Sequence, residues 1–281
     1  MLSHDSRVRL RRVGDAVLRV VDRIGEHAAF YALSIRYLPL AATRYRGETL
    51  RLVAEMTMGV GALVMIGGTV GVAAFLTLAS GGIVAVQGYK SLGDIGIEAL
   101  TGFLSAFLNV RIIAPVIAGI ALAATIGAGS TAQLGAMRVS QEIDALEAMA
   151  VRSIAYLVST RLIAGLVAVI PLYSLSVLAA FFAARFTTVY INGQSRGVYD
   201  HYFDTFLIPE NLLWSFVQAT LMAVAVMLVH TYYGYHASGG PVGVGVATGH
   251  AVRLSLILVV ITTLFVSLAV YGASSGFTLS G

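Results

Sequence analysis

Five long stretches of this 281-residue chain contain no Asp, Glu, Lys or Arg, and they restrict its possible folds more than any other feature. The stretches cover residues 56–89, 112–137, 162–184, 211–234 and 254–281. A helix needs about 20 apolar residues to cross a bilayer. Charged residues make up only 11% of the chain, against about 25% in a typical soluble domain. The sequence therefore predicts an all-α polytopic membrane protein with five transmembrane helices.

Two boundaries of these helices stay open. The uncharged stretch 99–110 is too short to cross alone, so it either lies at the interface or extends the second helix. The first stretch is longer than one crossing needs. We expect Ser80-Gly-Gly82 to end its helix and to leave residues 83–89 at the outer surface.

The arginines set the expected orientation. Ten of them precede Val53, and positive charge marks the cytoplasmic side of a membrane protein. With the N-terminus inside, segments 1–55, 138–161 and 235–253 are cytoplasmic. We expect a multi-pass protein of the inner (cytoplasmic) membrane whose C-terminus lies outside. A nucleic-acid partner is not expected, because the basic end adjoins so many apolar stretches.

The N-terminal region reads as an amphipathic helix over residues 10–38, with Val13, Val17 and Val20 on its apolar face. Such a helix lies along the membrane surface, or else docks on the protein's own cytoplasmic face. We divide the chain into an arginine-rich interfacial region, residues 1–51, and a membrane domain, residues 52–281.

No residue set is typical of catalysis or of a metal site. The chain has no cysteine, and its six histidines form no pair spaced by four residues. His230 falls inside a span, where a structural role is favoured over a proton relay. The single lysine, Lys90, follows Tyr89 and not a glycine, so the chain has no Walker A motif. We expect no enzyme activity and no cofactor in this chain.

Small residues at a spacing of four predict close helix packing. The second span carries Ala123, Gly127, Thr131 and Gly135 in this pattern. The first span repeats the spacing with Gly67 and Gly71. Pro171 is expected to kink the third span.

A charged island, residues 138–152, separates the second and third spans. We expect a short amphipathic helix with Ser140 as its N-cap and with Glu142 and Asp144 in the first turn. Its apolar face would hold Ile143, Leu146, Met149 and Ala150, and its acidic face Glu142 and Glu147. A solvated loop helix explains these charges but not the apolar face, which instead favours docking to a soluble partner.

Two blocks of this sequence resemble the MlaE/YrbE family of permeases, the membrane subunits of Mla and Mce lipid-transport ABC systems. The first contains Pro115-Val-Ile-Ala-Gly and Gln133-Leu-Gly-Ala-Met-Arg-Val-Ser-Gln-Glu-Ile-Asp-Ala-Leu-Glu-Ala-Met-Ala-Val. The second contains Tyr233-Gly-Tyr-His-Ala-Ser-Gly-Gly and Gly243-Val-Gly. The chain departs from the family pattern at Ile112-Ile-Ala114, where Glu-Leu-Gly is common, and at Val246, where arginine is common.

The resemblance implies a permease that moves lipid, in the direction of import, through a cavity between two permease subunits. It implies a cytoplasmic ABC ATPase dimer, which binds the ATP and Mg and docks on the island helix, and MCE-domain proteins on the outer side. The arginine-rich composition is similar to the actinobacterial YrbE branch, which implies a heterodimer of two permeases. The alternatives are a membrane-embedded lipid-modifying enzyme and a passive anchor for an MCE protein.

Overall fold

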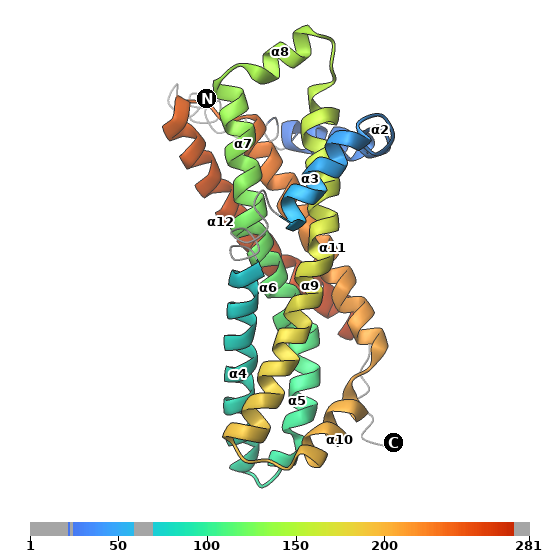
Figure 1. Cartoon of the computed structure of the whole chain (residues 1–281), viewed down its shortest axis with the longest axis vertical. Helices are drawn as coiled ribbons and strands as arrows, with labels where there is room; N and C mark the ends of the chain where they lie inside the picture. Colours follow the sequence, from blue (N-terminus) through green and yellow to red (C-terminus); the bar gives the residue numbers. More distant parts are fainter. Residues whose placement is uncertain (1–21, 23–24, 59–69, 273–281) are drawn as a thin grey trace, which may run out of the picture.

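The fold is a bundle of long helices, as a computed structural model of the chain shows (Figure 1). The structure describes residue 22 and residues 25–58 and 70–272. Five of the described helical segments are long and apolar enough to cross a membrane: Gly71–Gly93, Glu98–Val139, Ile154–Ile191, Pro209–Tyr235 and Gly240–Val270. The predicted all-α architecture with five spans is therefore confirmed.

The described part of the chain is almost entirely helical. In chain order the helical elements are residues 25–36, α2 (Leu38–Arg44), α3 (Arg46–Met58), α4 (Gly71–Gly93), η2 (Glu98–Leu100), α5 (Thr101–Leu108), η3 (Asn109–Ile113), α6 (Ala114–Leu122), η4 (Ala123–Gly127), α7 (Ala128–Val139), α8 (Glu142–Ala148), η5 (Ile154–Ser159), α9 (Thr160–Phe186), η6 (Thr187–Ile191), α10 (Arg196–Phe206), α11 (Pro209–Tyr235), α12 (Gly240–Val266) and η7 (Ser267–Tyr271).

The second span is one continuous helical segment of 42 residues, from η2 to α7. The stretch 99–110 therefore extends this span, which was one of the two alternatives. Two five-residue π-helical turns, η3 and η4, interrupt its α-helical hydrogen bonding. Pro115 is the second residue of α6, just beyond η3, and has no N–H to donate. The wider turn before it is consistent with that missing bond. In the third span, α9 continues through Pro171 to Phe186.

The prediction that Ser80-Gly-Gly82 ends the first helix is wrong, because α4 continues to Gly93. The glycines serve packing instead. A Cβ at Gly81 would lie 2.8 Å from the carbonyl oxygen of Ala180, so α4 and α9 approach here as closely as their backbones allow.

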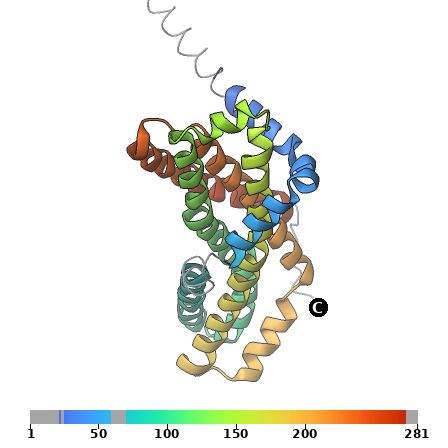
Figure 2. The ribbon, with the colours of Figure 1, turned by 45° about the horizontal axis from the view of Figure 1, so that its top comes forward.

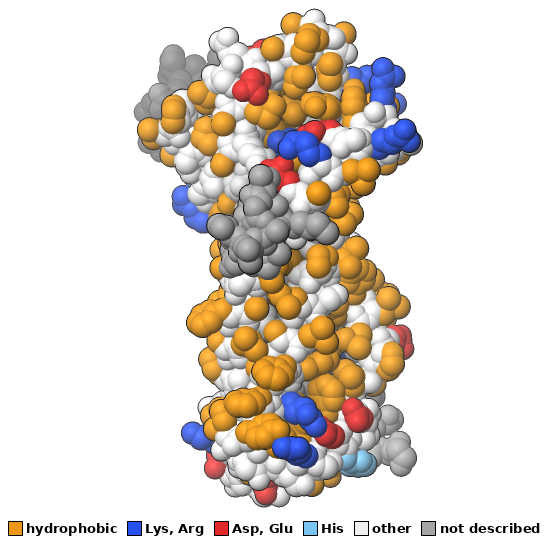
Figure 3. Space-filling view, in the orientation of Figure 1, with side chains coloured by type: hydrophobic (Ala, Val, Ile, Leu, Met, Phe, Trp, Pro, Cys, Tyr) orange, Lys and Arg blue, Asp and Glu red, His pale blue; other side chains and the backbone are white. Residues whose placement is uncertain are grey.

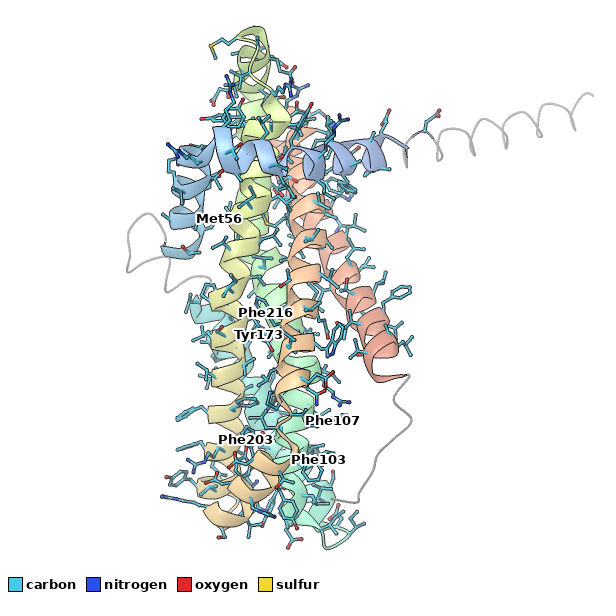
Figure 4. The ribbon with its side chains drawn as sticks, turned by 90° about the vertical axis from the view of Figure 1, so that its right-hand side faces the viewer. Met56, Phe103, Phe107, Tyr173, Phe203 and Phe216 are labelled. Atoms are coloured by element: carbon cyan, nitrogen blue, oxygen red, sulfur yellow. The ribbon has the colours of Figure 1, made fainter. Side chains whose placement is uncertain are left out.

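The bundle core lies where α6, α9 and α11 meet. Leu122, Leu172, Met222 and Met227 are buried there with many small side chains. Gly165 receives the Met227 side chain, whose Cγ would lie 2.5 Å from an added Cβ. Small residues on one helix thus make room for large ones on the next. Figure 4 labels Tyr173 and Phe216, whose rings meet between α9 and α11 with centroids 5.6 Å apart.

Residues 25–36 and α2 lie across the ends of the long helices (Figure 4). The helix ends at a turn at Tyr37, two residues before Pro39, and α2 then begins at Leu38. Residues 10–21, 23 and 24 of the predicted amphipathic helix lie outside the described part. Phe30 is buried, and Ser159 donates a hydrogen bond to the Ser34 carbonyl at 2.8 Å. The helix therefore packs on the protein's own bundle.

Charged side chains gather at the two ends of the bundle, and an apolar belt separates them (Figure 3). Exposed Leu178, Phe182 and Leu264 contribute to the apolar surface. In water such a surface would be unfavourable, whereas lipid chains solvate it. The belt therefore marks the membrane-embedded part of the molecule.

We predict that Gly234→Ala destabilises the bundle. The new Cβ would lie 2.9 Å from the Thr131 carbonyl oxygen and 3.0 Å from its Cα, and backbone atoms cannot rotate away. The expected loss is about 1–3 kcal/mol, measured as a lower thermal midpoint in detergent. The control is Gly129→Ala, where nothing lies within 4 Å. This change should leave the midpoint unchanged or raise it, and an equal loss in both variants would contradict the packing argument.

Candidate functional site

The short helix α8 projects beyond the spans at one end of the bundle, beside the N-terminal helices (Figures 1 and 2). It connects the second span to the third. Two residues other than glycine adopt the left-handed backbone conformation on either side of α8. They are Gln141, with φ 61°, and Ala150, with φ 58°. Such residues are uncommon and conformationally costly. The reversals at both ends of α8 are therefore held by the surrounding contacts.

The predicted cap of this helix is corrected by the structure. Ser140 is the residue after α7, and its hydroxyl donates to the Ala136 carbonyl at 3.0 Å. The N-cap position of α8 is Gln141, which has no side-chain capping bond. The chain must turn sharply after α7, and Ser140 still completes that helix, so it cannot also begin α8. Its hydroxyl oxygen also lies 2.8 Å from Glu142 Oε1.

Half of the predicted apolar face of α8 is used within the chain. Ile143 is fully buried against Leu134 of α7 and Leu157 of η5, and Leu146 packs on the same cluster. Met149, just after the helix, is 66% exposed. The cluster fixes the underside of α8 to the ends of two spans, and Met149 remains available on the surface.

Polar contacts hold α8 from the sides. Arg138 of α7 pairs with Asp144 at 2.7 Å. Glu147 Oε1 accepts hydrogen bonds from the Ser153 hydroxyl at 2.6 Å and from the Tyr235 hydroxyl at 2.9 Å. Since Tyr235 belongs to α11, α8 is tied to the ends of three spans. These hydrogen bonds favour the carboxylate and lower the pKa of Glu147 below its usual value.

Tyr235 also belongs to an aromatic cluster that holds the N-terminal helix. Phe30 contacts Tyr235 and Tyr232 with ring centroids 5.5 Å and 5.3 Å apart. His27 stacks on Tyr232 at 3.9 Å. The end of α11 therefore joins α8 on one side to the helix 25–36 on the other. The sequence placed Tyr235 in a family block but did not predict a contact for it. A tyrosine hydroxyl at the end of an apolar span could have indicated that it bonds a polar group there.

The predicted small residues of the second span line its contact with α11 and α12. Gly127 lies against the ring of His230, where an added Cβ would be 2.5 Å from Cδ2. Thr131 Oγ1 lies 2.7 Å from His230 Nδ1, and both residues are buried. Gly135 lies against Val244 of α12, and Ala123 is buried in the core. His230 is therefore packed and hydrogen-bonded between helices.

Of the two small residues predicted to pack in the first span, Gly67 and Gly71, the structure describes only Gly71. Gly71 begins α4 and is exposed, with nothing within 4 Å of an added Cβ. Gly67 lies outside the described residues. Within the part of the chain that the structure describes, no group of three or more His, Asp or Glu side chains is arranged to hold a metal ion.

We predict that the attachment of α8 weakens at acidic pH. The pKa of Glu147 is lowered in the folded protein, so its ionised form adds stability above the usual pKa, and this is lost as pH falls through the lowered value. A spin label on Ala148→Cys should become more mobile over that range. Glu147→Gln should remove the pH dependence, and an unchanged profile in that variant would contradict the assignment to Glu147.

Comparisons with known proteins agree with this architecture. The family described as "Permease MlaE" matches residues 60–269. A "Probable ABC transporter permease protein" of Rickettsia prowazekii is 25% identical over 252 residues, which cover 89% of this chain and 97% of the relative. The "Intermembrane phospholipid transport system permease protein MlaE" of Haemophilus influenzae is 24% identical over 186 residues, covering 64% and 69%.

A plant protein is also similar. The chloroplastic "Protein TRIGALACTOSYLDIACYLGLYCEROL 1" of Arabidopsis thaliana is 25% identical over 163 residues, covering 58% of this chain and 47% of the relative. The family match extends over all five spans and the α8 region. The chain therefore belongs to the MlaE permease family, as a multi-pass ABC transporter permease without an ATPase site of its own.

Proposed function

We propose that this chain is the permease of an MCE-associated lipid transporter of the YrbE type, which imports lipid using a separate ATPase dimer. The observation that carries the proposal is the attachment of α8. Its underside and sides are fixed to α7, η5 and α11, whereas Met149 is exposed. A push on its outer face would reach three spans at once. This is the mechanical requirement for coupling a soluble motor to a membrane domain.

Lipid as the transported substance is supported by the relatives. The Haemophilus influenzae relative is named as the permease of an intermembrane phospholipid transport system. A lipid needs an apolar path, and the apolar belt of this chain can border one. We place that path between two permease subunits, where MCE-domain proteins on the outer side would receive or deliver the lipid.

A second, different permease subunit completes the proposal. Among the five spans, Gly71–Gly93 and Gly240–Val270 are the least covered by the chain itself, with 28% and 17% of their most apolar 18-residue stretches buried. These spans offer surface to another subunit or to lipid. The choice of a heterodimer rests on the resemblance to the YrbE branch, and the division at residues 51 and 52 remains part of the proposal.

We predict that Met149→Asp releases the ATPase without unfolding the permease. An unpaired charge buried in an interface costs about 3–5 kcal/mol. This cost weakens binding by about a hundredfold or more. Leu146 is unsuitable for this test because it also packs under α8. The measurement is the amount of ATPase that co-purifies with the permease from its native host, alongside lipid uptake.

The matched control for this experiment is Ile95→Asp. Ile95 is 69% exposed, like Met149 at 66%, but it lies in the turn after α4, at the opposite end. This variant should keep the ATPase.

Asp144→Lys should also weaken docking, with an effect that declines in high salt. Normal ATPase recovery with both Met149→Asp and Asp144→Lys would show that α8 does not couple the two proteins.

We predict that α8 is cytoplasmic and that α10 lies outside. The chain has no cysteine, so single cysteines report their own position. Ser195→Cys should react with an impermeant maleimide in intact cells, and Ala148→Cys only after permeabilisation. Both positions are exposed, whereas Ser153 is buried and would react poorly on either side. The reverse pattern would overturn the orientation inferred from the arginines.

A further inference from the structure

A small cavity lies between the end of α9 and α10, at the end of the bundle opposite α8. Its volume is about 250 Å³. Figure 4 labels Phe203, one of its residues, near this end of the bundle. The cavity is lined by Phe181, Phe182, Arg185, Tyr199, Asp200, Phe203 and Asp204. It is remote from α8 and its contacts, so the coupling role does not account for it.

The walls of this cavity are aromatic and well supported. Phe181 and Phe203 meet edge to face, with centroids 4.9 Å apart. Tyr199 stacks beside Phe203 at 5.8 Å and is almost fully buried. Its hydroxyl lies 2.9 Å from the Ser105 hydroxyl of α5, which anchors α10 to the bundle. The rings are thus held in place before any ligand arrives.

The rim of the cavity carries excess negative charge. Arg185 donates two hydrogen bonds to Asp200, at 2.8 Å and 2.7 Å. This pairing lowers the pKa of Asp200 and uses the one arginine of the lining. Asp204 has no salt-bridge partner among the described residues. Aromatic faces beside a carboxylate attract organic cations such as alkylammonium groups.

The cavity adjoins the apolar belt. Leu178, Phe182 and Phe186 follow one another at helical spacing on α9, and all three are exposed. In Figure 3 the apolar surface gives way to charged side chains at this end of the molecule. A lipid lying along this face of α9 would place its headgroup beside Asp204.

We propose that this cavity binds the ammonium headgroup of a zwitterionic phospholipid, with phosphoethanolamine or phosphocholine chemistry, from the leaflet on the α10 side. The site is separate from the proposed path between subunits. It requires only that the chain lies in a bilayer, so it holds whatever the direction of transport.

The test compares lipids with identical acyl chains. The full-length permease, with the subunits that co-purify, is placed in nanodiscs of equal phosphatidylcholine, phosphatidylethanolamine and phosphatidylglycerol. The lipids retained after extraction are then counted by native mass spectrometry. We expect the two zwitterionic lipids to be retained about tenfold over phosphatidylglycerol. Asp204→Asn should abolish this preference, and Phe182→Leu should reduce it.

The matched control is Asp94→Asn, an exposed carboxylate at the same end that does not line the cavity. It should keep the wild-type preference. Equal retention of phosphatidylglycerol, or an unchanged preference in Asp204→Asn, would overturn the proposal and favour a basic side chain of a partner protein as the occupant.

Glycerophosphocholine, which has no acyl chains, should bind at least about tenfold more weakly than the lipid. Equal binding would overturn the lipid assignment.

Discussion

The structure depends on how closely its helices approach one another. Within a bilayer, apolar side chains gain little by leaving lipid for protein, so helices associate through tight packing and a few buried polar contacts. Gly81 against Ala180, Gly127 against His230 and Gly165 against Met227 are such approaches. Each removes one side chain so that a neighbouring backbone, ring or thioether can take its place. The positions of the spans relative to one another follow from these contacts.

The same packing makes the α8 end a single mechanical unit. The end of α7 carries α8, the end of α11 supplies Tyr235, and η5 supplies Leu157. Further into the bundle, the contact between Thr131 of α7 and His230 of α11 joins the second and fourth spans again. A displacement of α8 therefore cannot be absorbed by one loop. It must move helices whose contacts extend through the apolar belt.

The two ends of the molecule differ in chemistry. At the α8 end, arginines, carboxylates and an exposed methionine face water, as suits a protein partner. At the α10 end, an aromatic cavity with an acidic rim meets the lipid-facing surface of α9. We infer that one end responds to a soluble motor and that the other contacts headgroups of the surrounding bilayer.

The sequence by itself determined the class of fold, the number of spans and the position of α8, because uncharged stretches of this length can only form helices in a membrane. It also located Glu147, Asp144 and Ile143 on one short helix. It could not show that Ile143 lies underneath and Met149 outside, because helical spacing gives a face but not the neighbour that covers it. Nor could it show that Ser80-Gly-Gly82 is a packing site, since a glycine pair reads equally as a helix end. Only the tertiary structure, by bringing Ala180 against Gly81 and Tyr235 against Glu147, decided between these alternatives.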